Sequence, residues 1–230
     1  EVRAATPRRL VYCLPMRVLV EQTQKEAGIW IEKLAKASLL GKKPGVHILM
    51  GGEETEDWEV YPELDALLIG TQDMLLSRAL NRGYAASRSR WPMQFGLLHT
   101  DCLWILDEIQ LMGSGLATTA QLEAFRRLLP DPDSADAKTG RGCRSVWMSA
   151  TLEKSWLSTV DLAPFLKDST DLNLDAEDKQ TVKKRWEAKK PLGRTACGME
   201  DKTRDLAGEM LEKHRPGTLT IAVVNTVRRA

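Results

Sequence analysis

Two adjacent carboxylates, Asp107 and Glu108, are the residues of this sequence best suited to chemistry. They directly follow the apolar run Leu103–Leu106, which predicts that they lie at the tip of a buried strand. A carboxylate there can hold Mg²⁺ through water, because Mg²⁺ prefers octahedral oxygen ligands and keeps several waters. Its neighbour can orient and deprotonate a water that attacks a γ-phosphate. A helix N-terminus is the alternative interpretation, with Asp107 as the N-cap and Glu108 favoured by the helix dipole.

The other apolar runs of the chain also end in small or polar residues. In chain order these ends are Pro15-Met16-Arg17, Gly51-Gly52, Gly70-Thr71-Gln72, Ser149-Ala150-Thr151 and Asn225-Thr226. Ligands of open parallel sheets bind outside the carboxyl ends of the strands. We therefore expect the following side chains along one rim: Arg17, Asp107, Glu108, Ser149 and Thr151. The alternative is that loops are polar everywhere, which explains any single end more easily than all of them.

Short apolar runs alternate with helix-like stretches in the order β-α-β-β-α-β-α-β-α. Strands are expected at 10–14, 46–50, 66–69, 102–106, 145–148 and 218–224. Helices are expected at 16–40, at 72–81, after Asp107-Glu108 as far as about residue 129, and at 201–214. The runs are apolar throughout rather than alternating, which favours an α/β fold with a parallel sheet and helices on both faces. Trp30, Trp104 and Trp147 are expected in the core. His47, His99 and His214 are expected to be packing or surface residues.

Composition excludes several classes of protein for this chain. The 230 residues carry 33 basic and 32 acidic side chains, so a uniformly basic nucleic-acid coat is excluded, whereas a local basic strip is not. The four cysteines form no C-x-x-C pair, which argues against a zinc ribbon and against a small disulfide scaffold. No apolar run approaches ~18 residues, so no transmembrane helix and no membrane partner are expected. A reducing cytoplasm is the expected location.

Residues 82–92 form a second group of candidate binding residues, here in a basic loop. Arg82, Arg88 and Arg90 are interleaved with Tyr84 and Trp91. Rings and guanidinium groups together suit the bases and phosphates of a single strand. A solvated loop with Trp91 packed beneath it is at least as good an interpretation.

The motifs taken together resemble those of superfamily 2 helicases of the DExH/DEAD-box type. Asp107-Glu108-Ile109-Gln110 resembles motif II, Ser149-Ala150-Thr151 motif III, Leu14-Pro15-Met16-Arg17 motif Ia, Gly51-Gly52 the small-residue motif after it, Gly70-Thr71-Gln72-Asp73 motif Ib, and Val223-Val224-Asn225-Thr226-Val227 motif IV. The order of these motifs and their approximate spacing agree with the family pattern over almost the whole chain. The residues of motifs II, Ib and IV are most similar to those in the helicase portion of the CRISPR-associated helicase–nuclease of type I systems.

The resemblance implies a RecA-like domain at 1–167 that lacks its P-loop strand, a charged linker at 168–200, and the beginning of a second RecA-like domain at 201–230. It implies ATP and Mg²⁺ as cofactors, with Asp107 binding Mg²⁺ through water and Glu108 activating water. The residues that would couple nucleotide state to nucleic-acid grip are Gln110, Ser149, Ala150 and Thr151. Those that would contact single-stranded DNA are Pro15, Arg17, Gly51, Gly52, Thr71, Gln72, Asn225 and Thr226. The CRISPR RNA-guided surveillance complex is the implied partner.

Three features depart from the family pattern. Gln110 stands where motif II has His or Asp, and Met16 stands where motif Ia commonly has Thr. No P-loop sequence G-x-x-x-x-G-K-[ST] occurs in the 230 residues. In the family, motif I precedes motif Ia, so we expect it upstream of Glu1, and motifs V and VI beyond Ala230. Another superfamily 2 ATPase and a non-catalytic nucleic-acid-binding module remain alternatives.

We predict that the isolated 230 residues bind ATP weakly and do not unwind nucleic acid. Without a P-loop, the phosphates lose the backbone amides and the Lys that hold them. The measurement is ATP turnover with and without single-stranded DNA. Hydrolysis that this chain accelerates in response to DNA would refute the prediction.

Overall fold

The computed structural model describes residues 6–51, 58–128, 142–189, 203–221 and 223. The chain divides into two compact units, Glu1–Thr170 and Asp171–Ala230. The first unit contains the sheet. The described helices of the second are α6 (Ala176–Thr181), α7 (Lys183–Trp186) and α8 (Thr203–Lys213).

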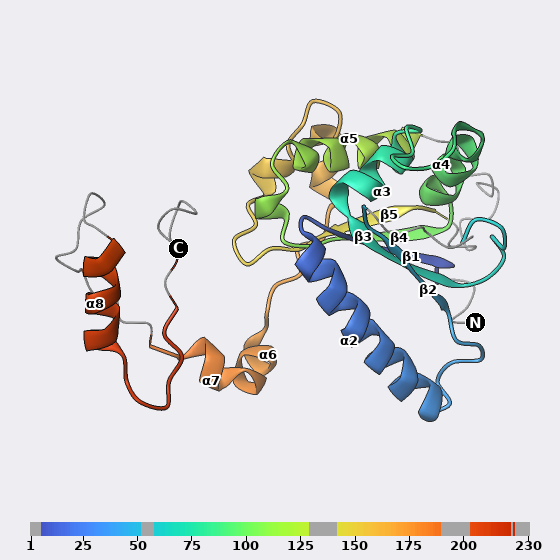
Figure 1. The fold of residues 1–230 in the computed structure, drawn as a ribbon. Coiled ribbons are helices and arrows are strands. Elements are labelled where there is room, and N and C mark those ends of the chain that lie inside the picture. Colours follow the sequence, from blue (N-terminus) through green and yellow to red (C-terminus); the bar gives the residue numbers. More distant parts are fainter. Residues whose placement is uncertain (1–5, 52–57, 129–141, 190–202, 222, 224–230) are drawn as a thin grey trace. The chain divides into compact units, whose positions relative to one another are not determined.

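The first unit is built on a five-stranded parallel sheet with strand order β2-β3-β1-β4-β5 (Figure 1). The strands are β1 (Arg9–Leu14), β2 (Gly45–Leu49), β3 (Ala66–Thr71), β4 (Cys102–Leu106) and β5 (Arg144–Trp147). All six residues of β3 are buried, as expected for a strand covered on both faces. The predicted α/β fold with a parallel sheet is confirmed.

Helices cover both faces of this sheet. Helix α2 (Arg17–Lys36) lies on one face, and α3 (Gln72–Ala79), α4 (Trp91–His99) and α5 (Ser114–Leu128) lie on the other (Figure 1). The core beneath α3–α5 is the larger one and includes Val11, Leu68 and Trp104. A smaller core beneath α2 includes Val20 and Ile69. Alternation of side chains along each strand supplies both cores.

Helix α2 corrects one expectation about the core. The residues of α2 that pack against the sheet include Leu19, Val20, Ala27 and Ile31, at helical spacing. Trp30 lies on the outward surface and is 59% exposed, with the Lys33 ammonium 4.9 Å from its ring centroid. The expectation that Trp30 belongs to the core is therefore wrong. Trp104, by contrast, is 1% exposed.

Two predicted segments also differ from the structure. Residues 82–92 were expected as a loop, but they contain the 3₁₀ turn Arg88–Arg90 and the start of α4. Pro92 does not prevent this helix, because proline is tolerated in a first helical turn. Residues 218–224 were expected as a strand, yet 218–221 and 223 are not in one. Leu219 and Val223 are exposed, so the described part of this apolar run lacks the neighbour that a strand needs. None of the described helices is long and apolar enough to cross a membrane.

Candidate functional site

The carboxyl ends of the central strands meet at one edge of the sheet. The amide of Asp107, directly after β4, donates to the carbonyl of Cys13 in β1 at 3.1 Å. The amide of Met148, directly after β5, donates to the carbonyl of Leu106 at 2.8 Å. These two bonds continue the ladders past the strands, so the polar residues that follow β1, β4 and β5 emerge side by side.

The Asp107 carboxylate is held in place by two donors. The Tyr12 hydroxyl donates to Oδ2 at 2.8 Å, and the Glu108 amide donates to Oδ1 at 2.8 Å. Burial and the neighbouring Asp107 carboxylate raise the pKa of Tyr12, so the phenol stays protonated and remains a donor. A carboxylate offers about four lone-pair sites, so acceptor capacity is left over for water. Asp107 is not an N-cap, because the helix that follows, α5, begins only at Ser114.

Glu108 has a left-handed backbone conformation. Its φ and ψ are 51° and 42°, in a region that non-glycine residues rarely adopt. Such a conformation costs on the order of 1–3 kcal/mol and is found disproportionately at functional sites. It turns the chain sharply from β4 into the 3₁₀ turn Ile109–Leu111. The turn sets the direction in which the half-buried Glu108 carboxylate leaves the strand tip.

Gln110 connects the end of β4 to the end of β5. Its side-chain amide nitrogen donates to the Glu108 carboxylate. Its amide oxygen accepts a hydrogen bond from the Ser149 hydroxyl at 2.7 Å. The same hydroxyl accepts from the Thr151 amide at 3.1 Å, while Ala150 lies exposed between them. An amide can accept and donate at once, so Gln110 makes a continuous hydrogen-bonded path from Glu108 to Ser149.

Arg17 connects the ends of β1 and β2. Its guanidinium donates to the Gly51 carbonyl at 2.7 Å and is otherwise exposed. Pro15 immediately precedes this turn and is half-buried. An arginine has five N–H donors, so most of them stay available to an oxygen-rich ligand.

The end of β3 is less open than the sequence suggested. Thr71 is 8% exposed. The side-chain oxygen of Gln72 is buried and has no hydrogen-bond partner, and a Cβ on Gly115 would lie 2.4 Å from it. The Gln72 side chain is therefore directed at the start of α5 rather than into solvent. Gly52, Asn225 and Thr226 lie outside the described residues.

The basic segment 82–92 belongs to the other edge of the sheet. Helix α3 carries the chain away from Thr71, and the first residue of β1, Arg9, hydrogen-bonds to carbonyls of Leu97 and Thr100 there. Arg90 forms an ion pair with the buried Glu59. The indole of Trp91 donates to the Ala86 carbonyl at 3.0 Å. These contacts favour the packing interpretation for Arg90 and Trp91.

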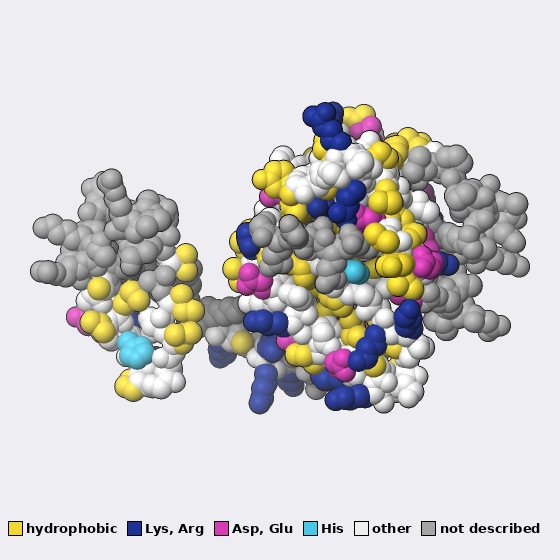
Figure 2. Space-filling view, turned by 45° about the vertical axis from the view of Figure 1, so that its right-hand side comes forward, with side chains coloured by type: hydrophobic (Ala, Val, Ile, Leu, Met, Phe, Trp, Pro, Cys, Tyr) yellow, Lys and Arg dark blue, Asp and Glu magenta, His cyan; other side chains and the backbone are white. Residues whose placement is uncertain are grey.

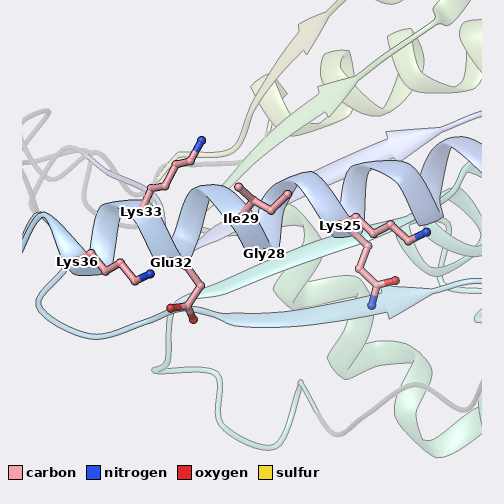
Figure 3. A pocket seen from close by; sticks show the side chains of 7 residues that line it. Lys25, Gly28, Ile29, Glu32, Lys33 and Lys36 are labelled. Atoms are coloured by element: carbon pink, nitrogen blue, oxygen red, sulfur yellow. The ribbon is translucent and has the colours of Figure 1, made fainter.

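A hollow of about 710 Å³ lies on the outer face of α2 and is lined by residues of that helix alone, including Lys25, Ile29 and Lys33 (Figure 3). It is separate from the strand tips. On the face in Figure 2, Lys and Arg side chains lie between acidic and hydrophobic ones, as the net charge of +1 leads one to expect.

Comparison with protein families agrees with this geometry. A family model described as DEAD/DEAH box helicase matches residues 3–160, which include all five strands and the polar ends of β1, β3, β4 and β5. The chain belongs to the DEAD/DEAH box helicase family. Its sheet is that of a RecA-like domain, and the family couples ATP, generally with Mg²⁺, to the remodelling of nucleic acids. A comparison with curated proteins gives no match.

The donor set at the β4 tip fits Mg²⁺ in the way that nucleotide-dependent enzymes hold it. Among the described residues, no three His, Cys, Asp or Glu side chains gather as a metal-binding group. Mg²⁺ is commonly held by one or two carboxylates, several waters and the substrate phosphates rather than by an all-protein cage. The Asp107 carboxylate suits such a site. Tyr12, which orients this carboxylate, was missed in the sequence, where its only signal is a phenol inside an otherwise apolar strand.

Proposed function

We propose that this chain is part of an ATP-driven motor that moves along single-stranded DNA in CRISPR antiviral defence, as the helicase portion of a helicase–nuclease. Family membership supports the motor, and the resemblance of motifs II, Ib and IV supports the CRISPR role. The observation that carries the proposal is the path from Glu108 through Gln110 to Ser149, because it joins the candidate catalytic carboxylate to a second strand end.

In this proposal the residues at the β4 tip divide the chemistry of hydrolysis. Asp107 holds Mg²⁺ through water, and the ion, when bound, neutralises charge on the phosphates. Glu108 orients the attacking water and accepts its proton. Tyr12 keeps the Asp107 carboxylate in one orientation, which favours one geometry of attack.

The same path gives the proposed motor a way to sense its nucleotide. A movement of the Glu108 carboxylate changes the bond that it accepts from Gln110, and Gln110 in turn holds the Ser149 hydroxyl. Ser149 and Thr151 lie in the segment that follows β5, so a change at one strand end reaches the next. We assign the coupling role to Gln110, Ser149, Ala150 and Thr151, with Gln110 in place of the usual His or Asp.

Single-stranded DNA is proposed to lie along the ends of β1 and β2. Arg17 and backbone groups near Pro15 and Gly51 can bind phosphates without reading sequence. Thr71, Gln72, Gly52, Asn225 and Thr226 complete the proposed set. Because Thr71 and the Gln72 oxygen are buried, we expect them to contribute chiefly through backbone groups.

Replacing Arg17 with Ala is expected to weaken binding of labelled single-stranded DNA about 3- to 10-fold at low salt. One lost phosphate contact should also reduce the salt slope by roughly 0.7. Fluorescence anisotropy over a salt series gives both values. The matched control is Arg82→Ala, which removes the same charge from an exposed residue in the basic segment 82–92. An equal or larger loss with Arg82→Ala would contradict the proposed path.

Gene neighbourhood tests the CRISPR role, and relative affinity tests the preference for DNA over RNA. Genes for CRISPR proteins next to the gene for this chain would support the role, and their absence would favour another superfamily 2 ATPase. Tighter binding to RNA than to DNA of the same sequence would argue for an RNA-remodelling enzyme.

A further inference from the structure

Two cysteines lie opposite each other at the amino-terminal ends of β4 and β5, which is the end of the sheet away from the candidate site. The ladder between β4 and β5 pairs Leu103 with Arg144, so one step back places Cys102 opposite Cys143. Adjacent strands are about 4.7–4.9 Å apart, and a disulfide needs Cα atoms about 4.4–6.8 Å apart. Both side chains belong to the core cluster beneath α3–α5, so they point to the same face. Their positions therefore suit a bond without movement of the strands.

At rest both thiols lie against backbone carbonyls. The Cys102 sulfur is 2.9 Å from the Leu97 carbonyl oxygen and 3.2 Å from that of Thr100, and the Cys143 thiol donates to the Leu98 carbonyl at 3.7 Å. Burial disfavours ionisation of Cys102. The neighbouring Cys143 thiol and the positive charges of Arg9 and Arg126 outweigh burial and lower the pKa of the Cys102 thiol. Cys102 is thus the more readily ionised thiol of the pair, and Cys143 lies directly opposite it in the ladder.

We propose that Cys102 and Cys143 form a dithiol that hydrogen peroxide oxidises to a disulfide between β4 and β5. The Cys102 thiolate attacks one peroxide oxygen, the O–O bond breaks, and the hydroxide that leaves takes up the proton released by Cys102. Cys102 is then a sulfenic acid. The Cys143 sulfur attacks the Cys102 sulfur, the S–O bond breaks, and the leaving hydroxide takes the Cys143 proton. Two thiols lose two electrons, and one peroxide becomes two waters.

The disulfide closes a loop over residues 102–143. This loop contains Asp107, Glu108 and Gln110 as well as α5, so both ends of the segment that bears the candidate site become tied together. Strand β5 has only four residues and lies at the edge of the sheet. Cross-linking it to β4 limits the local opening expected of a short edge strand. The modification therefore acts on the site through its supporting strands.

The test is peptide mapping of the chain after treatment with hydrogen peroxide. A Cys197→Ser background removes the cysteine outside the described residues. After quenching, the chain is denatured, free thiols are alkylated, and the protein is digested without reductant for mass spectrometry. We expect a linked peptide pair containing Cys102 and Cys143 that dithiothreitol separates. Cys13 lies opposite Gly70 and Leu106 in the neighbouring strands, so it has no cysteine to pair with; it should be alkylated and serves as the internal control.

Two further measurements keep the result interpretable. In Cys143→Ser, the linked pair should disappear and Cys102 should stop as a sulfenic or sulfinic acid. The oxidised chain should melt roughly 5–10 °C above the reduced chain. The proposal is overturned if both thiols are still alkylated after peroxide treatment, or if either is linked to Cys13 instead. It is also overturned if the linked chain melts no higher than the reduced one, since the bond would then need a distorted sheet.

Discussion

Replacing Gly70 with Ala is expected to destabilise the chain by about 3 kcal/mol. Gly70 lies in β3 opposite Leu49 of β2. A Cβ there would lie 2.5 Å from the Leu49 carbonyl oxygen and 2.9 Å from its Cβ. The nearer atom belongs to the backbone of a paired strand, so it cannot move without separating β2 from β3. Equilibrium unfolding in urea measures the change.

A matched control for this substitution is Gly28→Ala. Gly28 lies on the outer face of α2, and a Cβ there meets nothing within 4 Å. Alanine favours a helix by about 1 kcal/mol over glycine, so this variant should be more stable than the natural chain. A loss at Gly70 no larger than the error of the measurement would show that β2 and β3 are not as closely packed as described. Gly70 also precedes Thr71, so its variant should disturb the β3 end of the candidate site.

Acidification from pH 7 to pH 4 is expected to remove about 3 kcal/mol of stability through His99 alone. Burial and the nearby Arg126 charge lower the pKa of His99 from 6.5 to about 4. Arg126 Nε donates to Nδ1 at 3.0 Å, and the other ring nitrogen lies 2.7 Å from the Ala79 carbonyl oxygen, so the folded protein holds a neutral ring. The unfolded chain binds a proton there below about pH 6.5. Between pH 6.5 and pH 4 the unfolded chain therefore binds a proton at His99 that the folded protein does not, which favours unfolding.

The test of this pH dependence compares the natural chain with His99→Gln. A glutamine amide can accept from Arg126 and donate to Ala79, but it does not titrate. Both proteins should lose stability as their carboxylates are protonated, and the natural chain should lose about 3 kcal/mol more by pH 4. Unfolding free energies measured in urea at several pH values give the difference. Parallel curves would contradict the assignment of a buried neutral ring.

The parallel sheet was predictable because burial on both faces leaves a direct trace in sequence. Runs such as 66–69 are apolar at every position, and a polar residue follows wherever a strand reaches the open edge. Helix α4 left no comparable trace, since Pro92 and Gly96 interrupt its pattern. The expected strand that residues 218–221 and 223 do not form and the wrong core position for Trp30 share one cause. Apolar residues predict burial only where another element lies against them.

The candidate site was predictable in its positions but not in its contacts. Asp107, Glu108 and Ser149 could be placed at strand tips from the apolar runs before them. The Tyr12 hydroxyl on Asp107 and the bond from Ser149 to Gln110 depend on contacts between segments far apart in sequence. The left-handed backbone of Glu108 is rare for this residue type, so the residue itself does not predict it. The inward direction of Gln72 likewise depends on space left by Gly115. Tertiary packing decides such details, and local sequence does not encode them.

The most direct test of the proposed metal site is Mn²⁺ titration of the ¹⁵N-labelled chain. Mn²⁺ can replace Mg²⁺ at oxygen ligands, and its paramagnetism broadens nearby amide signals even at low occupancy. The account predicts that the amides of Asp107, Glu108 and Ser149 broaden most and that Asp107→Asn, which keeps the shape of the side chain, removes the effect. Broadening centred elsewhere, or equal broadening in Asp107→Asn, would contradict the assignment of the β4 tip as the metal-binding centre of this helicase domain.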